Sequence, residues 1–398
     1  MLSTGTMAAF GFLFWTLVAR LYTPEEIGVA STLITAMIFI SYVSLFGFNS
    51  TFVHFLPRSK KRNEHINTGL IVVCTAAIVF ATTYSLVAPH ISDTLSILRT
   101  NVFYAVGFVA LTTGFALNLL SDSIYVAFRA AKFNLFFDGF AAGITEVIMA
   151  PLFVSAAAFG IYTSQALGIF IALVFSLITL KRNYNYKPAL KIERATLREV
   201  KRYSLDSYVA NLLNIAPTMF IPLIVLTKLG SEAAGFYYLA FMIANMLYTV
   251  AYSVSQALFA EGSYKENVLS ILLKKATILL GVIIVPCSIA LGLIGPYILR
   301  IFGKTYSTHS HQLMYVLAAA GVFVATYIIS TTLLRILKHT KQLIYVNACY
   351  AISMFVGVWY GASHGLTGVG FGWLGAHAFT TLVALVVLQR AGVRRHFS

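Results

Sequence analysis

The sequence predicts an all-α polytopic membrane protein with 12 transmembrane helices. Hydrophobic residues make up 59% of the chain and charged residues only 10%, which leaves too little polar surface for a soluble domain. The apolar residues also form continuous runs of roughly 20 residues, the length that spans a bilayer as a helix. Such runs are too long and too uniform for the ~10-residue alternating strands of a membrane barrel.

The apolar runs give the elements in order. We expect helices at residues 3–20, 28–56, 68–88, 101–128, 134–157, 163–181, 204–227, 234–260, 268–294, 309–335, 342–361 and 366–389. No basic flank precedes the first run, so we interpret it as a crossing and not as a cleaved signal. The turn after it carries helix-start signals: Thr23 can cap the second helix, Pro24 suits its first position, and Glu26 completes a capping box.

Positive charge predicts the direction of the crossings. Of 28 Lys and Arg residues, 23 lie in every second gap or in the C-terminal tail, at 58–62, 129–132, 181–202, 265–275, 335–341 and 390–395. The remaining five are Arg20, Arg99, Lys228, Arg300 and Lys304. Because short cytoplasmic loops retain Lys and Arg, we expect the basic gaps and both chain ends to face the cytoplasm of a cell membrane.

Several function classes are disfavoured. The net charge of +15 is spread over six loops and forms no single basic face, so nucleic acid is not an expected partner. The three cysteines lie inside apolar runs, and His309 and His311 have no third ligand within sequence reach, so we expect no disulfide framework and no metal site. No GxxxxGK[ST] motif is present for ATP, and we expect no cofactor.

An internal repeat predicts two domains. Three motifs recur at offsets of 207 to 209: Arg20–Thr23 as Lys228–Ser231, Leu86–Ile91 as Leu293–Ile298, and Arg129 with Lys132 as Lys338 with Lys341. Because each half contains six helices, the halves insert with the same orientation and share a cleft. We expect six-helix bundles at 1–182 and 204–398, joined by a basic cytoplasmic linker at 183–203.

Three segments carry a family resemblance: 14–28 (FWTLVARLYTPEEIG), 295–303 (GPYILRIFG) and 360–368 (YGASHGLTG). They resemble the Wzx-type polysaccharide biosynthesis flippases of the multidrug/oligosaccharidyl-lipid/polysaccharide (MOP) exporter superfamily. The resemblance implies a MATE-like, V-shaped pair of bundles with alternating access. It also implies transfer of an isoprenoid-diphosphate-linked glycan from the cytoplasmic to the outer leaflet, with membrane lipids and a glycan polymerase or glycosyltransferase as partners.

Polar side chains at helical spacing predict a route for such a substrate. A sugar diphosphate needs a polar path, because each unsatisfied polar group costs on the order of several kcal/mol in hydrocarbon. The substrate-binding candidates are Arg20, Asn49, Asn118, Asp122, Arg129, Asn211, Asn214, Lys228, Tyr252 and Gln256. Arg20 and its repeat mate Lys228 could hold the diphosphate. Asn49 and Gln256, at an offset of 207, would lie symmetrically across the cleft.

Each candidate has a structural alternative. Asn, Ser and Thr side chains also join membrane helices to one another, Asp122 could form an ion pair with Arg129, and Arg20 could extend to lipid headgroups. A further stripe on the fifth helix contains Asp138, Thr145 and Glu146. Glu146 has no cation nearby in its own helix, so it is protonated, paired with another helix, or a residue that couples ions to transport.

Two other functions compete with the flippase. A MATE-type drug/cation antiporter would need a coupling carboxylate; the first helix has none, so Glu146 would have to substitute. A membrane enzyme of glycan assembly would carry catalytic residues in a large loop, whereas the outer loops here are short. We therefore expect a transporter and not an enzyme.

Overall fold

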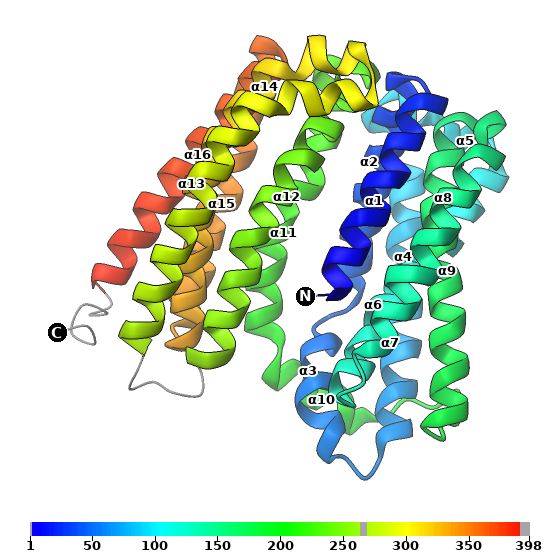
Figure 1. The fold of residues 1–398 in the computed structure, drawn as a ribbon. Coiled ribbons are helices and arrows are strands. Elements are labelled where there is room, and N and C mark those ends of the chain that lie inside the picture. Colours follow the sequence, from blue (N-terminus) through cyan, green and yellow to red (C-terminus); the bar gives the residue numbers. More distant parts are fainter. Residues whose placement is uncertain (1, 263–268, 391–398) are drawn as a thin grey trace. The chain divides into compact units, whose positions relative to one another are not determined.

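The computed structural model describes residues 2–262 and 269–390, and every regular element in these ranges is a helix (Figure 1). Ten segments are long and apolar enough to cross a membrane, and Gly5–Leu21 is a shorter apolar helix. The tenth segment, Thr340–Arg390, holds two helices separated by the turn Ala362–His364. The predicted all-α class with twelve crossings is confirmed. Lys265, Arg394 and Arg395 of the charge pattern lie outside the described residues.

The chain folds into two compact units, Met1–Tyr208 and Val209–Ser398. The first holds α1 (Leu2–Leu21), α2 (Pro24–Ser44), α3 (Phe48–Phe55), α4 (Arg62–Ile91), α5 (Ile97–Thr100), α6 (Val102–Ala127), α7 (Lys132–Asn134), α8 (Gly143–Leu152), α9 (Ala157–Asn183) and α10 (Arg194–Tyr203). Then follow α11 (Leu205–Leu229), α12 (Ser231–Gly262), α13 (Leu269–Phe302), α14 (Lys304–Ile336), α15 (Thr340–Gly361) and α16 (Gly365–Arg390). The domain boundaries expected at 182 and 204 stay a prediction.

The fourth crossing is the central helix of each unit. In the first unit α6 packs against α2, α3, α4 and α9, while α1 packs on α8. In the second unit α14 packs against α12, α13 and α16. Residues from α3, α4 and α6, among them Phe52, Val73 and Leu120, are almost fully buried in one apolar core of the first unit. The two units therefore repeat one packing plan.

The second crossing is broken, which the sequence did not predict. The expected helix at 28–56 ends as α2 at Ser44 and restarts as α3 at Phe48. Gly47 has φ +83°, a conformation that favours glycine. A Cβ on Gly47 would also lie 2.6 Å from the Cβ of Ser204. Glycine therefore permits both the turn and the close approach of the later segment.

Helix α2 begins as predicted. The backbone N–H of Thr23 donates to the Glu26 carboxylate at 2.8 Å, and the Glu26 N–H donates to Thr23 Oγ1 at 3.3 Å. This reciprocal capping box satisfies two backbone donors that have no partner inside the helix. Pro24 occupies the first turn.

Four glycines bring α15 and α16 into backbone contact. A Cβ on Gly357 would lie 2.8 Å from the carbonyl oxygen of Gly372, and one on Gly361 or Gly368 would overlap the carbonyl oxygen of the other. Small residues let membrane helices approach this closely. The two helices pack along their length as a hairpin.

The segment from 184 to 208 is attached to the first unit, where a solvated linker was expected. Asn67 of α4 accepts hydrogen bonds from the Tyr186 hydroxyl (2.5 Å) and the Ala189 N–H (3.2 Å), and its amide donates to the Lys187 carbonyl (3.1 Å). Asn67 is 5% exposed. One buried side chain thus fixes three successive parts of the segment.

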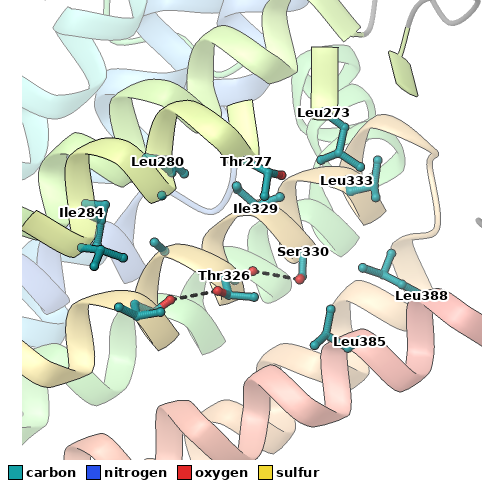
Figure 2. Close-up of a pocket in the computed structure, with 14 residues that line it drawn as sticks. Leu273, Thr277, Leu280, Ile284, Thr326, Ile329, Ser330, Leu333, Leu385 and Leu388 are labelled. Atoms are coloured by element: carbon teal, nitrogen blue, oxygen red, sulfur yellow. Dashed lines mark hydrogen bonds between the residues drawn. The ribbon is translucent and has the colours of Figure 1, made fainter. Parts of the chain in front are cut away.

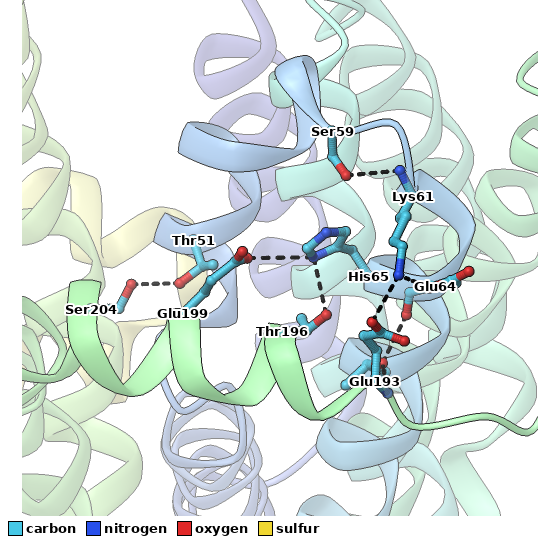
Figure 3. Close-up of polar contacts among 10 residues, drawn as sticks. Thr51, Ser59, Lys61, Glu64, His65, Glu193, Thr196, Glu199 and Ser204 are labelled. Atoms are coloured by element: carbon cyan, nitrogen blue, oxygen red, sulfur yellow. Dashed lines mark hydrogen bonds and ion pairs between the residues drawn. The ribbon is translucent and has the colours of Figure 1, made fainter.

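A second set of contacts extends along α10 (Figure 3). Lys61 Nζ lies 3.1 Å from Glu193 Oε1, and His65 Nδ1 lies 3.1 Å from Thr196 Oγ1. At the end of α10, the hydroxyls of Thr51 and Ser204 are 2.6 Å apart. The residues that precede the second unit therefore belong structurally to the first.

Candidate functional site: a polar cluster in each bundle

The first unit contains a buried polar cluster between its fourth and fifth crossings. Asn118 of α6 donates from Nδ2 to Asp138 Oδ1 at 2.8 Å. Asn118 is 3% exposed and Asp138 is 8% exposed. Asp122, one turn along α6, lies within hydrogen-bonding reach of Asp138. Two carboxyl groups this close in a buried site are stable when they share a proton.

A wide helical turn positions Asp138. Residues Leu135–Ala142 (η3) form a π-helix between α7 and α8. π-Helical turns displace side chains from the positions that an α-helix would give them, and they are frequent at functional sites. Here the turn carries Asp138 toward α6.

The expected ion pair between Asp122 and Arg129 is absent from the described part of the chain. Asp122 faces Asp138 instead, while Arg129 is exposed with φ +56°. Arg129 comes after the last helical residue of α6, and its left-handed conformation turns the chain away from the helix. The alternative in which Asp122 pairs with Arg129 therefore has no support in the described residues.

Glu146 is buried in α8, at 8% exposure. Within the described residues it has neither a hydrogen bond nor an ion pair. It packs on α9 at Gly168, where a Cβ would lie 2.8 Å from Glu146 Cγ and 2.7 Å from the Ala142 carbonyl oxygen. A buried carboxyl group without a cation partner is neutral at rest or exchanges its proton.

The second unit contains a chain of hydrogen bonds that joins three helices. Asn214 of α11 donates to the Tyr327 hydroxyl at 3.0 Å, and this hydroxyl donates to Asn347 Oδ1 at 2.8 Å. Asn347 in turn donates to the Ala210 carbonyl at 2.7 Å. The chain starts and ends on α11 and passes through α14 and α15, so it fixes how these helices are rotated.

Aromatic rings surround this chain. Tyr327 stacks on Tyr350 with ring centroids 4.9 Å apart, and His377 lies 5.8 Å from Tyr327 and 4.9 Å from Trp373. His377 is 3% exposed, and neither ring nitrogen has a hydrogen-bond partner in the described residues. Tyr252, a predicted site residue, lies close enough to Tyr327 for the two side chains to interact electrostatically.

The remaining predicted site residues lie near bundle surfaces. Arg20, Lys228 and Gln256 are exposed, Tyr252 is 45% exposed, and Asn49 and Asn211 are half-buried. Lys228 Nζ lies 3.8 Å from the centroid of the Trp359 ring, a cation–π contact between α11 and α15. Asn49 and Gln256 belong to different bundles, and their expected pairing stays a prediction.

Sequence reasoning missed Tyr327, Asn347 and His377. Each is a polar residue inside an apolar run, the signal that identified Asn118 and Asn214. They were not among the candidates because a single polar residue inside an apolar run can equally join helices to one another, and the sequence alone does not show its partner.

Residues 17–311 match the family described as polysaccharide biosynthesis proteins. No curated protein sequence matches the chain significantly. Among solved structures, the chain is similar to a multidrug-resistance MATE family transporter of the MOP superfamily in its inward-facing conformation. The two are 13% identical with a TM-score of 0.78, over 99% of this chain and 96% of the other.

Two further structures share the fold. The lipid II flippase MurJ in an inward closed conformation is 13% identical with a TM-score of 0.79, over 97% of this chain and 86% of that one. A MOP superfamily transporter from Pyrococcus furiosus is 15% identical with a TM-score of 0.67, over 98% and 93%. The chain has the MOP superfamily fold, and it belongs to the polysaccharide biosynthesis protein family.

Proposed function

We propose that the protein is a flippase that moves an isoprenoid-diphosphate-linked glycan from the cytoplasmic to the outer leaflet by alternating access. The observation that carries this proposal is the family match over residues 17–311, because the family is named for polysaccharide biosynthesis. The fold supports it, since a structure described as a lipid II flippase is built on the same plan.

The polar clusters give the proposal a physical basis. A glycan diphosphate must exchange its hydration for protein groups while it crosses, because hydrocarbon offers none. Buried hydrogen-bond networks in both bundles, around Asp138 and around Tyr327, support an interior that tolerates polar groups. We assign Asn118, Asp122 and Asn214 to shaping this interior, since each already has a partner within its bundle.

The surface candidates are the proposed contacts with substrate. Arg20 and Lys228 would hold the diphosphate, because a guanidinium or ammonium group donates charge-assisted hydrogen bonds to phosphate oxygens. The glycan would contact Asn49, Asn211, Tyr252 and Gln256. Arg129 would receive substrate at the cytoplasmic side. We also propose that both chain ends are cytoplasmic, that 1–182 and 204–398 are the functional domains, and that a glycan polymerase or glycosyltransferase acts beside the protein.

Glu146 is the proposed ion-coupling residue. It is buried and has no cation partner in the described residues. A carboxyl group in this setting can bind a proton in one state of the cycle and release it in another. Glu146→Gln would keep the size and polarity of the side chain but would remove the exchangeable charge.

The experiment is reconstitution in liposomes with an isoprenoid-diphosphate-linked oligosaccharide, followed by enzymatic detection of glycan on the opposite leaflet. We expect transfer by the wild type, and loss of transfer in Arg20→Ala with normal insertion. Wild-type vesicles that transfer no faster than empty ones would overturn the proposal. Normal transfer by Arg20→Ala would remove Arg20 from the site.

A MATE-type antiporter is the second candidate, because a MATE family transporter shares this fold over 99% of the chain with a TM-score of 0.78, close to the 0.79 of the lipid II flippase. The same vesicles distinguish it from the flippase. Uptake of a cationic dye driven by an ion gradient, without glycan transfer, would support the antiporter.

A further inference from the structure

Arg335 is a cation of the second bundle that the sequence placed only in the charge pattern. It lies in the last turn of α14, and its Cζ is 5.9 Å from the centroid of the Phe259 ring of α12. Tyr252 and Tyr327 lie close enough to interact with it electrostatically. In the described residues its side chain has neither a hydrogen bond nor an ion pair. Within this part of the chain, its five N–H donors are therefore available to a ligand.

The acidic residues of the second unit lie away from this guanidinium. Among the described residues of that unit, only Glu232 and Glu261 are acidic. Glu232 lies in the first turn of α12, about 40 Å before Phe259 along the helix axis. Glu261 follows Tyr252 by nine positions, which places it about 180° around the helix. Within the described residues no carboxylate neutralises Arg335, so its charge can meet an anion.

Helix α12 presents polar and aromatic side chains to Arg335. Tyr252, Gln256 and Phe259 follow at i, i+4 and i+7, so they lie on one face of the helix. Tyr252 is 45% exposed and Gln256 is exposed, and neither side chain has a hydrogen bond in the described residues. A guanidinium that lies over an aromatic ring keeps its in-plane N–H groups free. An anion beside α14 would thus find a guanidinium, a hydroxyl and an amide.

The opposite side of α14 offers a ligand mostly carbon (Figure 2). Leu333 lies two positions before Arg335, about 200° around the helix, and lines an apolar groove between α13, α14 and α16. In that groove the Thr326 hydroxyl donates to the Val322 carbonyl at 2.9 Å, and the Ser330 hydroxyl donates to the Thr326 carbonyl at 2.8 Å. Because their own helix satisfies both hydroxyls, contacts with a charged ligand belong on the α12 side.

We propose that Arg335, Tyr252 and Gln256 form a phosphate-binding site that receives the diphosphate of the carrier lipid. A guanidinium donates two parallel charge-assisted hydrogen bonds to phosphate oxygens. The site lies in the last turns of α12 and α14, at the end that the charge pattern predicts to face the cytoplasm. The assignment rests on the proposed flippase function and adds to it a head-group site within the second bundle.

A helix anchor is the competing role of Arg335. A cation near a helix C-terminus interacts favourably with the helix dipole, and its contact with Phe259 joins α14 to α12. An anchor predicts that Arg335→Gln and Phe259→Leu both lower the unfolding temperature and leave ligand binding unchanged. The phosphate site predicts the reverse for Arg335→Gln: weaker binding with little change in the unfolding temperature.

The test uses purified full-length protein in phosphatidylcholine nanodiscs and farnesyl diphosphate with a fluorophore at its hydrocarbon end. Fluorescence anisotropy gives the Kd, with empty nanodiscs as the blank. Arg335→Gln should raise the Kd by about tenfold or more, because it removes charge-assisted hydrogen bonds. Arg335→Lys should give an intermediate Kd, since lysine keeps the charge but not the planar fork. Arg390→Gln at the end of α16, beside Tyr345, is the matched control and should keep the wild-type Kd.

A second pair of variants tests the hydroxyl. Tyr252→Phe removes one oxygen and should raise the Kd by about threefold or more, as expected for one hydrogen bond to a charged group. Tyr345→Phe makes the same change on α15 and should not alter the Kd. Equal Kd values for Tyr252→Phe and the wild type would contradict the assigned set of donors.

Competition identifies the source of the phosphate. Unlabelled isoprenoid diphosphate and inorganic pyrophosphate should displace the probe, because the guanidinium binds the head group. Farnesol, which has the chain without the head, should not. Phosphatidylglycerol at the same concentration should not either, since a phosphodiester carries less negative charge than a diphosphate. An unchanged Kd in Arg335→Gln, an equal rise in Arg390→Gln, or equal competition by phosphatidylglycerol would each overturn the assignment.

Binding and translocation are measured separately, so failure of this site differs from failure of the flippase proposal. Diphosphate binding that Arg335→Gln weakens, in a protein that transfers no glycan, keeps the phosphate site and removes the flippase. Glycan transfer at the wild-type rate by Arg335→Gln keeps the flippase and removes the site.

Discussion

Arg129 and Lys338 occupy equivalent positions in the two bundles and share the same left-handed backbone conformation, with φ values of +56° and +59°. Arg129 follows α6 and Lys338 follows α14, the central helix of each unit. The backbone hydrogen bonds match as well. After α6, Arg129 N–H donates to Val126 O and Ala130 N–H donates to Tyr125 O. After α14, Lys338 N–H donates to Arg335 O and His339 N–H donates to Leu334 O. Both helices thus end in the same Schellman-type cap.

This shared cap predicts opposite effects of two substitutions. Arg129→Gly should stabilise the first bundle by about 1 kcal/mol, because glycine adopts positive φ without a Cβ clash. Arg129→Val should destabilise it, since a β-branched side chain is strongly disfavoured there. The same order should hold at Lys338. Denaturant titration of the detergent-solubilised variants measures this, and equal stability of Gly and Val variants would contradict it.

The close packing around Gly168 predicts that no larger residue fits beside Glu146, the ion-coupling candidate. A Cβ there would meet both Ala142 O and Glu146 Cγ below 3 Å, so Gly168→Ala should lower the free energy of unfolding by roughly 1–3 kcal/mol. Gly292→Ala, on an open helix face, should be neutral or stabilising by up to about 1 kcal/mol. Thermal unfolding of both variants provides the comparison, and an equally stable Gly168→Ala would refute the predicted contact.

The hydrogen bond between Asn118 and Asp138 predicts energetic coupling. Asp138→Ala should cost about 1–3 kcal/mol, because it leaves the buried Asn118 amide without its acceptor. With Asn118→Ala, a double-mutant cycle should give a coupling of about 0.5–3 kcal/mol. Ser123→Ala on the same helix, whose hydroxyl donates only to its own turn, should change stability by less than about 0.5 kcal/mol. Additive losses would show that the two side chains act independently.

The attachment of the 184–208 segment should depend on pH. The Lys61 hydrogen bond lowers the pKa of Glu193 from its ordinary 4.5, and the Glu193 hydrogen bond raises the pKa of Lys61 from 10.5. Because the pKa of Glu193 is lowered, its ion pair with Lys61 contributes stability above pH 4.5. This contribution is lost as the pH falls through the pKa of Glu193 in the folded protein. Because the pKa of Lys61 is raised, the same pair contributes stability below pH 10.5. This contribution is lost as the pH rises through the pKa of Lys61 in the folded protein.

We therefore expect residues 184–208 to be most protected from hydrogen exchange between pH 4.5 and pH 10.5. The protection factors of residues 187–196, which correct for the intrinsic pH dependence of exchange, should fall on acidification below pH 4.5 in the wild type. Glu193→Gln should have lower protection factors already at neutral pH, and these should fall less on acidification. Identical exchange in the two proteins from pH 4 to 8 would contradict a role for the ion pair.

Lys228 either binds the diphosphate or only packs against Trp359, and two variants distinguish these roles. Its contact with Trp359 stabilises α11 against α15 by about 0.5–1 kcal/mol, as expected for an exposed cation–π pair. If Lys228 holds the diphosphate, Lys228→Gln should reduce glycan transfer at least tenfold while Trp359→Leu affects mainly stability. Equal reductions by both variants would assign Lys228 to packing alone.

Much of the fold could be predicted because its signals are local. Apolar length fixes the crossings, and the Thr23–Glu26 capping box and the repeat of Arg129 at Lys338 are readable from a few residues each. The break at Gly47 was missed because a glycine within an apolar run is common in membrane helices. The packing of residues 184–208 on the first unit was missed because charged segments are usually solvated. The sequence around Asn67 also gives no sign that this side chain binds the segment.

The candidate site was harder to predict than the fold. Polarity identified Asn118, Asp138 and Asn214, but partners depend on how each helix is rotated, and the π-helical turn changes this rotation at Asp138. Asp122 was matched with Arg129 by their spacing along one helix, whereas the structure brings it to a carboxyl group on another. Tyr327 links Asn347 to Asn214, which lies 113 residues earlier in the sequence than Tyr327, and no periodicity along one helix predicts such a pairing.

The glycine contacts between α15 and α16 have a consequence for insertions and deletions in this part of the chain. Gly357 meets Gly372 and Gly361 meets Gly368 at backbone distance, so the hairpin can close in one register only. A one-residue insertion between Gly357 and Gly372 would shift the pairing and bring a residue with a Cβ against a carbonyl oxygen of the other helix. Backbone contacts within the hairpin therefore set the register of the last two helices.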